Sequence, residues 1–379
     1  MNGPRTKGGG AAGERDPTRQ EACAERLAER ARRLGPGAQL PQFRQLRTEL
    51  EVSGTTLIAA LDALEARGIL VRRHGVGIFV ARDVHHRNVA LLTAPRLFYR
   101  DENASPFWQQ FVRRAWLRAA TSGMHFALHF VDADEHDEAT DADGAPVSLG
   151  DILAADLRQG VIHGVLGVGL PACAVQWLTR RGIPLVAFAG YAPYAVMTDE
   201  ALGVQLAVKT LFDRGARRIA LWTTSERDGT VRTAYRQALE MRGLADDPSL
   251  VNGGREADTI VSSLREGERI ARDVFGPGRD PRNRPDAVYC AEDTLTRGAL
   301  PWLFRTGIRI GVDLPFATHA NTGSPLLFGW EDYLIRIEND PARVIEEMFR
   351  LLTAQMDGRT PSEERVILPP TVRIPPPTA

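Results

Sequence analysis

Hydrophobic residues recur at helical spacing in two short segments near the start of the chain. Residues 17–34 place Cys23, Leu27 and Ala31 on one stripe, and the Gly-Pro-Gly that follows is expected to end this helix. Residues 40–52, LPQFRQLRTELEV, carry leucines four positions apart. This spacing predicts a second, shorter amphipathic helix.

A third helix is predicted from residue 54 onward, and Gly68 is expected to end it. Ser53 precedes it as a typical N-cap residue, because its hydroxyl can accept a backbone N–H of the first turn. Leu57, Leu61 and Leu64 fall on one face and are expected to be buried. Polar residues and Ile58 occupy the other face, which is predicted to be exposed.

Two short strands follow, ILVRR and GIFVA, joined by a turn that contains Gly75 and Gly77. A dinucleotide-binding Gly-x-Gly lies between a strand and a helix, whereas here a second strand follows, so the glycines are predicted to form a hairpin tip. Three helices and a hairpin in about 65 residues are typical of a winged helix. Its third helix can enter a DNA major groove, and its hairpin, the wing, can contact the backbone or the minor groove.

From residue 88 the pattern changes to short apolar runs that alternate with amphipathic segments. This alternation predicts βαβ units, a mainly parallel α/β domain, and two sheets with a cleft between them. Ligands in such sheets bind beyond the carboxyl ends of the strands. Strands are expected at residues 88–93, 124–134, 161–169, 183–190, 217–223, 285–293 and near 316–321, and helices at residues 105–123, 149–160, 172–182, 199–215, 233–243 and 294–307.

Composition adds an uneven charge to this picture. Residues 1–87 carry 15 arginines and lysines against 10 acidic residues, a net charge of +5, although the whole chain carries −1. A basic unit on a larger acidic one indicates a polyanion partner at one end. Three distant cysteines fit a reducing compartment, and the polar start and short apolar runs predict a cytoplasmic protein with no membrane contact.

The segment from Leu40 to Ala81 resembles the GntR-type winged helix. LPQFRQLR, VSGTTLIAAL and HGVGIFVA follow the family's pattern in order. The resemblance implies binding to a double-stranded DNA operator through the second and third helices and the wing. The residues expected to meet DNA are Arg44, Ser53, Gly54, Thr55, Thr56, Ile58, Arg73, His74, Gly75 and Gly77.

Two of these positions depart from the family. Gly54 and Ile58 stand where the family usually has arginines that read bases. Each lost bidentate contact removes about 1–3 kcal/mol of base discrimination. Thr55 and Thr56 remain for phosphate oxygens, and Ile58 can contact a thymine methyl group. An alternative therefore stays open, in which DNA binding is weakened and the chain acts as a small-molecule sensor or protein-binding module.

The remainder of the chain resembles the effector domain of LacI/GalR-type repressors, a relative of periplasmic binding proteins. The likeness lies in an ordered series of segments, among them PDAVYCAEDTLTRGALPWLFRTG. It implies a small-molecule effector in the cleft, a sugar or a sugar derivative. The candidate effector-binding residues are Ser105, Phe107, Trp108, Asp132 with Asp134, Tyr191, Arg232 at the opening of its helix, Asp293, His319 and Asn321.

Other chemistries are not supported by the residues. The acidic run over residues 132–143 lacks the glycine and final glutamate of a calcium loop, so no metal site is expected. Some GntR-type proteins carry an aminotransferase-like domain that needs a Schiff-base lysine, but Lys209 falls within a helical pattern rather than at a strand end. We therefore expect no enzyme activity and no cofactor.

The sequence as a whole predicts a multi-domain transcription regulator, most simply a repressor of sugar-utilisation genes. We expect a disordered tail (residues 1–16), a winged helix-turn-helix domain (17–82), a linker (83–88) and a two-lobed periplasmic-binding-protein-like domain (89–379). Two-fold operators and the family resemblance imply a homodimer. The identity of the effector, the operator sequence, and the choice between inducer and corepressor stay open.

Overall fold

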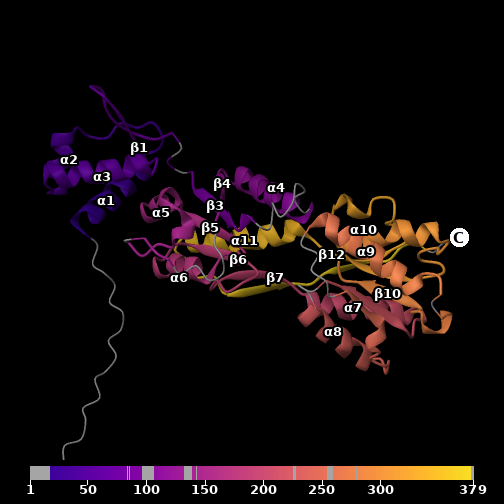
Figure 1. The fold of residues 1–379 in the computed structure, drawn as a ribbon. Helices are drawn as coiled ribbons and strands as arrows, with labels where there is room; N and C mark the ends of the chain where they lie inside the picture. Colours follow the sequence, from indigo (N-terminus) through magenta and orange to yellow (C-terminus); the bar gives the residue numbers. More distant parts are fainter. Residues whose placement is uncertain are drawn as a thin grey trace, which may run out of the picture. The chain divides into compact units, whose positions relative to one another are not determined.

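The computed structural model describes residues 18–82, 84, 86–95, 106–131, 139–141, 143–224, 228–253, 259–278 and 280–376. The chain divides into two compact units (Figure 1). The first contains residues 1–87 and 152–162, and the second contains residues 88–151 and 163–379. In the described parts, no helix is long and apolar enough to cross a membrane.

The first unit is built on three helices, as the hydrophobic pattern predicts. They are α1 (Arg19–Leu34), α2 (Phe43–Leu50) and α3 (Gly54–Ala66), and the unit also includes most of α5 (Asp151–Arg158). Leu27, Leu46, Leu57, Leu61 and Leu64 all lie in its core, each with at most 1% of its surface exposed. Burial of these side chains, each worth about 1.5–3 kcal/mol, is what orients α3 with its polar face outward.

The wing consists of β1 (Leu70–Arg73) and β2 (Gly77–Val80), which pair antiparallel. Residues 38–40, between α1 and α2, pair with β2 at the second edge of the wing. The sequence did not predict this pairing. The backbone N–H of Leu40 donates to the carbonyl of Ile78 at 2.8 Å, and that of Val80 donates to Ala38 at 2.8 Å. The wing is thereby anchored to the helices along its second strand.

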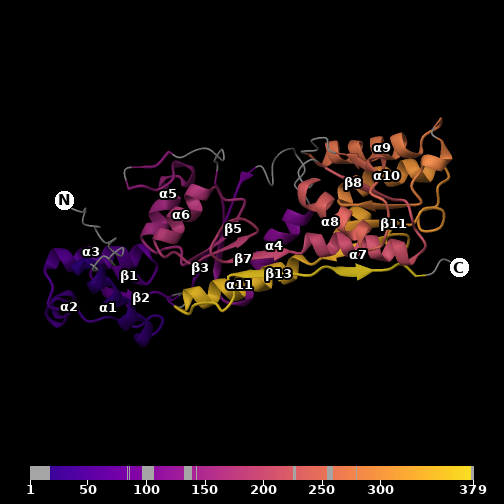
Figure 2. The same cartoon turned by 90° about the horizontal axis from the view of Figure 1, so that it is seen from below.

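The second unit contains two sheets, as predicted (Figure 2), and each of them has six strands. In the first lobe the strand order is β13-β7-β6-β5-β3-β4, and in the second it is β14-β12-β11-β10-β8-β9. Strand β14 runs antiparallel to β12, and the other described pairings in these sheets are parallel. The strands are β3 (Asn88–Thr93), β4 (His125–Phe130), β5 (Gly164–Val168), β6 (Leu185–Phe188), β7 (Ala195–Thr198), β8 (Ile219–Thr223), β9 (Val251–Gly253), β10 (Ala287–Cys290), β11 (Phe316–Asn321), β12 (Ile335–Asn339), β13 (Arg365–Leu368) and β14 (Thr371–Arg373).

Helices cover these sheets and bury their apolar faces. They are α4 (Pro106–Thr121), α6 (Ala172–Arg180), α7 (Glu200–Asp213), α8 (Asp228–Glu240), α9 (Ile260–Phe275), α10 (Asp293–Arg305) and α11 (Pro341–Met356). In the second lobe, α9 and α10 share one core with the sheet, and α7 and α8 share another with it. In the first lobe, α4 and α11 pack together with strands of the sheet.

The main chain passes between the lobes three times. It does so from β7 to α7, from β12 to α11, and from β13 to β14. Two of these crossings are joined directly, because the backbone N–H of Asp199 donates to the carbonyl of Leu368 at 2.9 Å. Three connections of a few residues each thus join the two lobes, an arrangement typical of domains that close by hinge motion.

Several elements differ from the sequence-based prediction. Strands β7, β9 and β12 and the whole of helix α9 were not predicted. Helix α8 begins at Asp228, well before the predicted start, so Arg232 does not open the helix as expected but lies within it. Of the missed elements, β7 belongs to the first lobe and the others to the second, and β7 and β12 lead into two of the three crossings.

Candidate functional sites

Helix α3 presents a short polar edge at its start. The Ser53 hydroxyl accepts the backbone N–H of Thr56 at 3.1 Å, and this hydroxyl also lies 2.8 Å from the Thr55 hydroxyl and 2.7 Å from that of Thr56. The N-cap predicted at Ser53 is present, and it fixes where the helix begins. Ile58, on the next turn, has 48% of its surface exposed.

Gly54 leaves this edge open. A Cβ atom built on Gly54 would meet nothing within 4 Å, and its backbone does not need the left-handed conformation. Arg44 is exposed on α2. This edge of α3 therefore presents hydroxyl groups, the aliphatic side chain of Ile58 and, at Gly54, a position with no side chain. Arg44 adds a positive charge on the neighbouring helix α2.

The wing carries two consecutive arginines with different surroundings. The guanidinium of Arg73 lies over the ring of Phe79, 5.0 Å from its centroid. Arg72 instead forms ion pairs with Asp62 (2.5 Å) and Glu65 (2.6 Å) of α3. The hydrogen bonds that Arg72 donates to Glu65 raise the pKa of Arg72, so its positive charge is already paired within the protein.

The tip of the wing is the turn between these strands. His74 is exposed there, and Gly75 has a φ of +71°, a left-handed conformation that favours glycine. Gly77 has a φ of +148°, and the backbone N–H of Val76 closes the turn by donating to Arg73. The predicted DNA-contacting residues thus gather on exposed parts of α2, α3 and the wing.

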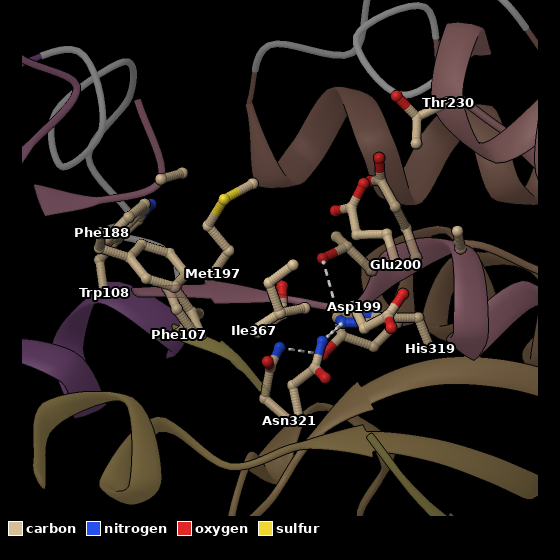
Figure 3. Close-up of a pocket in the computed structure, with 17 residues that line it drawn as sticks. Phe107, Trp108, Phe188, Met197, Asp199, Glu200, Thr230, His319, Asn321 and Ile367 are labelled. Carbon is tan, nitrogen blue, oxygen red and sulfur yellow. Dashed lines mark hydrogen bonds between the residues drawn. The ribbon is translucent and has the colours of Figure 1, made fainter. Parts of the chain in front are cut away.

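A cavity of about 650 Å³ opens in the second unit beside the crossings (Figure 3). Of the residues predicted to bind an effector, Phe107, Trp108, Asp293, His319 and Asn321 line it. The other lining residues are Phe188, Ala189, Met197, Thr198, Asp199, Glu200, Ala201, Thr230, Glu292, Thr294, Asn339 and Ile367. Both lobes contribute, and much of the lining comes from the ends of strands, where a ligand is expected in this type of sheet.

One side of the cavity is aromatic. The ring centroids of Phe107 and Trp108 are 4.7 Å apart and those of Phe107 and Phe188 are 5.7 Å apart, and the first pair meets edge to face. Phe111 supports all three rings from the core of the first lobe. Figure 3 shows these rings together, across the cavity from Asp199 and Glu200.

The opposite side is polar and hydrogen-bonded. Asp293, which is 8% exposed, begins α10 directly after β10, and the Asn321 amide donates to it at 3.4 Å. His319 and Asn339 lie at the ends of neighbouring strands, with Nε2 and Nδ2 3.1 Å apart. These bonds hold carboxylate, amide and imidazole groups in fixed positions facing the space.

Some predicted effector residues lie elsewhere. Tyr191 is 89% exposed and is not among the residues that line the cavity, and Arg232 within α8 is not among them either. Ser105, Asp132 and Asp134 lie outside the described residues. Within the described ranges, no group of three or more histidine, cysteine or acidic side chains is arranged to hold a metal ion.

The sequence did not identify several lining residues. Asp199 was hidden by its role as N-cap of α7, where it accepts the backbone N–H of Leu202 at 2.9 Å. Glu200 and Glu292 likewise lie at helix starts, where acidic residues are common for structural reasons. Asn339 ends β12, a strand that was not predicted. The signal that could have identified these residues is their position, because each of them lies at a junction between a strand and a helix.

Two family models match the chain. Residues 20–80 match the model described as "Bacterial regulatory proteins, gntR family", and residues 208–374 match "Periplasmic binding protein-like domain". Together with the fold, these matches confirm the predicted architecture, a GntR-type winged helix followed by a two-lobed, periplasmic-binding-protein-like α/β domain.

Two relatives and one solved structure share 21–30% of their residues with the matched parts of the chain. The chain is 24% identical over 300 residues to an arabinose metabolism transcriptional repressor of Halalkalibacterium halodurans, covering 74% of this chain and 73% of that protein. It is 30% identical over 130 residues to the HTH-type transcriptional repressor PurR of Vibrio atlanticus, covering 33% of this chain and 36% of the relative. Among solved structures, a LacI-family regulatory protein from Chloroflexus aggregans superposes with a TM-score of 0.59 at 21% identity, covering 76% of this chain and 96% of that one.

Proposed function

We propose that this chain, which joins a GntR-type winged helix to a LacI-type effector domain, is a ligand-responsive transcription repressor of sugar-utilisation genes. One observation carries the proposal: a single chain combines an exposed helix edge and wing suited to DNA with a hinged domain whose cavity lies at the strand ends. Two relatives are named as transcriptional repressors, and these names support the proposal.

The chemistry of the cavity supports a sugar or a sugar derivative as effector. Aromatic rings can stack on the apolar face of a sugar ring, while Asp293, Asn321 and His319 can exchange hydrogen bonds with hydroxyl groups. The relative from Halalkalibacterium halodurans is named for arabinose metabolism. That name supports the class of ligand and not arabinose itself.

The hinge supplies a way to couple ligand to DNA. A ligand that contacts Phe107 and Phe188 of the first lobe and Asp293 of the second stabilises the conformation in which both contacts form. Such a ligand changes DNA affinity only through its different affinities for the conformations of the protein. In a homodimer, this change would alter how two winged helices meet a two-fold operator.

The experiment is a titration of fragments from the protein's own promoter region with full-length protein. We expect binding that weakens steeply between 50 and 200 mM salt, about as expected when several phosphates are contacted. A sugar that raises the melting temperature of the protein should also change the midpoint of this titration. Absence of salt-sensitive binding to every fragment would rule out the repressor function.

A second function is favoured by one observation. With glycine at position 54 and isoleucine at position 58, the start of α3 carries no long cationic side chain. The chain could then act as a small-molecule sensor or protein-binding module with weakened DNA binding. In that case the melting temperature would respond to a ligand, whereas DNA binding would be weak and equal for all fragments.

A further inference from the structure

The described lining of the cavity divides by lobe. The first lobe supplies apolar side chains from α4, from β6 and the turn after it, from β7 and from β13, namely Phe107, Trp108, Phe188, Ala189, Met197 and Ile367. Thr198, at the end of β7, is the polar residue among those described in this lobe. The second lobe supplies mainly polar side chains, from the starts of α7, α8 and α10 and the ends of β11 and β12. A ligand that fills the cavity therefore meets an apolar wall on one side and a polar wall on the other.

The aromatic part of the apolar wall is a packed cluster of rings. Phe107 and Phe188 each meet Trp108 edge to face, with ring centroids 4.7 Å and 6.1 Å from that of Trp108. These contacts between the rings use part of each ring's surface. A sugar ring has one apolar face that can stack on a single aromatic ring, and the rest of the sugar carries hydroxyl groups. The cluster is therefore wider than the stacking of one sugar ring requires.

Two side chains without hydrogen-bond donors extend this wall beyond the rings. Ile367 on the edge strand β13 lies directly beside Met197 in the parallel pairing of β13 with β7. In the view of Figure 3 both side chains lie between the aromatic rings and Asp199. Ile367 is 57% exposed, so a carbon-rich group of a ligand that displaces water from it is stabilised by the hydrophobic effect.

We propose that the effector is a glycoside, with its sugar ring on the polar wall of the second lobe and an apolar aglycone on the wall of the first. This rests on the proposed function and specifies the ligand of the same site. A free monosaccharide carries hydroxyl groups around its ring, and those pressed against Met197 and Ile367 would lose water without gaining a hydrogen bond. An apolar aglycone is instead stabilised in proportion to the area that it buries there. The cavity, about 650 Å³, is within the range that takes a drug-sized ligand, so it has room for both parts.

The two parts of such a ligand would also connect the two lobes. The sugar ring contacts strand and helix ends of the second lobe, and the aglycone contacts side chains of the first. A ligand with both parts stabilises the conformation in which both contacts form, whereas a sugar that contacts the second lobe alone does not favour it. The aglycone should therefore strengthen the effect of the ligand on operator binding as well as its affinity.

The test is calorimetry and thermal shift on the full-length protein with matched compounds. The probes are the phenyl glycosides of glucose, galactose and arabinose in both anomeric forms, each compared with its methyl glycoside and its free sugar. Cellobiose and lactose serve as glycosides with a polar aglycone. At least one phenyl glycoside should bind about tenfold more tightly than its methyl glycoside, its free sugar and both disaccharides, as expected when a phenyl ring leaves water. The proposal is overturned if no phenyl glycoside binds, or if one of the polar counterparts binds as tightly.

Variants assign the preference to the wall of the first lobe. Met197→Gln and Ile367→Thr each replace an apolar surface with a more polar one of similar shape. Each should lower affinity for the phenyl glycoside about three- to tenfold and change affinity for the methyl glycoside much less. Ile374→Thr, at a position that is 58% exposed and outside the cavity lining, is the matched control and should change neither affinity. Equal losses for the two glycosides in both lining variants would contradict the proposal.

Operator binding in the same preparations separates the two proposals. If a free sugar binds as tightly as its phenyl glycoside and changes operator affinity, the repressor function stands and the apolar aglycone fails. If a phenyl glycoside binds with the expected preference but no promoter fragment is bound, the ligand class stands and the repressor function fails.

Discussion

Arg72 of the wing is fixed to Glu65 of helix α3 by two hydrogen bonds. Its backbone N–H donates to Glu65 Oε1 at 3.0 Å, and its Nε donates to Oε2 at 2.7 Å. The wing and the exposed face of α3 are therefore oriented relative to each other by an ion pair and by a backbone hydrogen bond to the same carboxylate. The neighbouring Arg73, stacked on Phe79, is the wing arginine whose charge we expect DNA to use.

Replacing Glu65 with glutamine should loosen the wing. Hydrogen bonds from Arg72 lower the pKa of Glu65 in the folded protein, so the stabilisation is complete above the unfolded-state pKa of about 4.3. It is lost as the pH falls through the lower folded-state pKa. Because the Glu65 side chain is 36% exposed and solvent screens the pair, we expect a stabilisation of less than about 1 kcal/mol. Faster hydrogen exchange of the wing amides in Glu65→Gln at neutral pH is the measurement.

The control for this prediction is Glu29→Gln, which removes an exposed carboxylate paired only loosely with Arg33 on the same helix. Its wing amides should exchange as in the wild type. Exchange rates that are the same in Glu65→Gln and Glu29→Gln would mean that the wing is held by its pairing with residues 38–40 alone.

Removing either of two arginines should weaken DNA binding for an electrostatic reason. Arg44→Ala and Arg73→Ala each delete an exposed cation, so each should lower affinity on all sequences and reduce the slope of log affinity against log salt by about 1. Titration of a promoter fragment at several salt concentrations measures both. Arg282→Ala, 89% exposed in the second unit, should leave the slope unchanged. A wild-type salt dependence of DNA affinity in both variants would mean that DNA does not contact Arg44 or Arg73.

The first unit could be predicted closely because its apolar stripe has no interruptions. Leu57, Leu61 and Leu64 point to one core, and Ser53 marks the first turn of α3. The hydrophobic pattern of α3 and the capping residue at its start indicate the same helix, so neighbouring residues in the sequence were enough to predict it. The pairing of residues 38–40 with β2 was missed because it depends on contacts distant in sequence.

Helix α9 shows why other elements escaped. Its buried face includes Ser263, Glu266 and Gly267 among apolar residues, so the periodic signal was broken. Glu266 is buried because Arg269 pairs with it, and Gly267 is buried because α10 passes close by. The approach of α10 is a tertiary contact, which a single sequence does not display, whereas the Glu266–Arg269 pair lies within α9 itself.

The cavity was predicted in part for a similar reason. Asp293 follows an obvious strand, and its location beyond that strand marked it as a ligand candidate. Asp199 and Asn339 depend on which strands cross between the lobes, and the strands before them, β7 and β12, are four and five residues long. Short strands without alternation carry little signal on their own.

The close approach of α9 and α10 predicts a stability effect. A Cβ on Gly267 would overlap the carbonyl oxygen of Leu295, so Gly267→Ala should force the helices apart and destabilise the second lobe by about 1–3 kcal/mol. Thermal unfolding of the full chain measures this. Gly229→Ala in α8, where a Cβ would meet nothing within 4 Å, is the control and should leave the melting temperature nearly unchanged. Equal melting temperatures for the two variants would contradict this packing.

Replacing Asp293 with asparagine should separate ligand response from DNA binding. The change removes a buried negative charge from the cavity with little change in shape, and a hydrogen bond to a charged group contributes about 1.5–3 kcal/mol. Effector affinity measured by calorimetry should fall about ten- to a hundredfold while operator binding persists. Asp246→Asn, outside this cavity lining, should change neither. If the Asp293→Asn variant keeps wild-type affinity for the effector, Asp293 does not bind the effector.

The start of α3 has room for a residue that reads bases. Nothing lies within 4 Å of a Cβ placed on Gly54, and the buried Leu57 and Leu61 keep this edge turned outward. With no long side chain at this position or at Ile58, specificity must come from the hydroxyls, from methyl contact by Ile58, from the wing, or from deformability of the DNA.

Gly54→Arg should therefore add a base contact without disturbing the fold. We expect a new base preference at one symmetric pair of operator positions, and binding tighter by about 1–3 kcal/mol where a guanine is offered there. Selection from a randomised operator library, with wild type and variant side by side, measures this. Gly54→Ala is the matched control, since it adds only a methyl group and should keep the wild-type preference. Identical preferred sequences for wild type and Gly54→Arg would mean that this end of α3 does not enter the major groove.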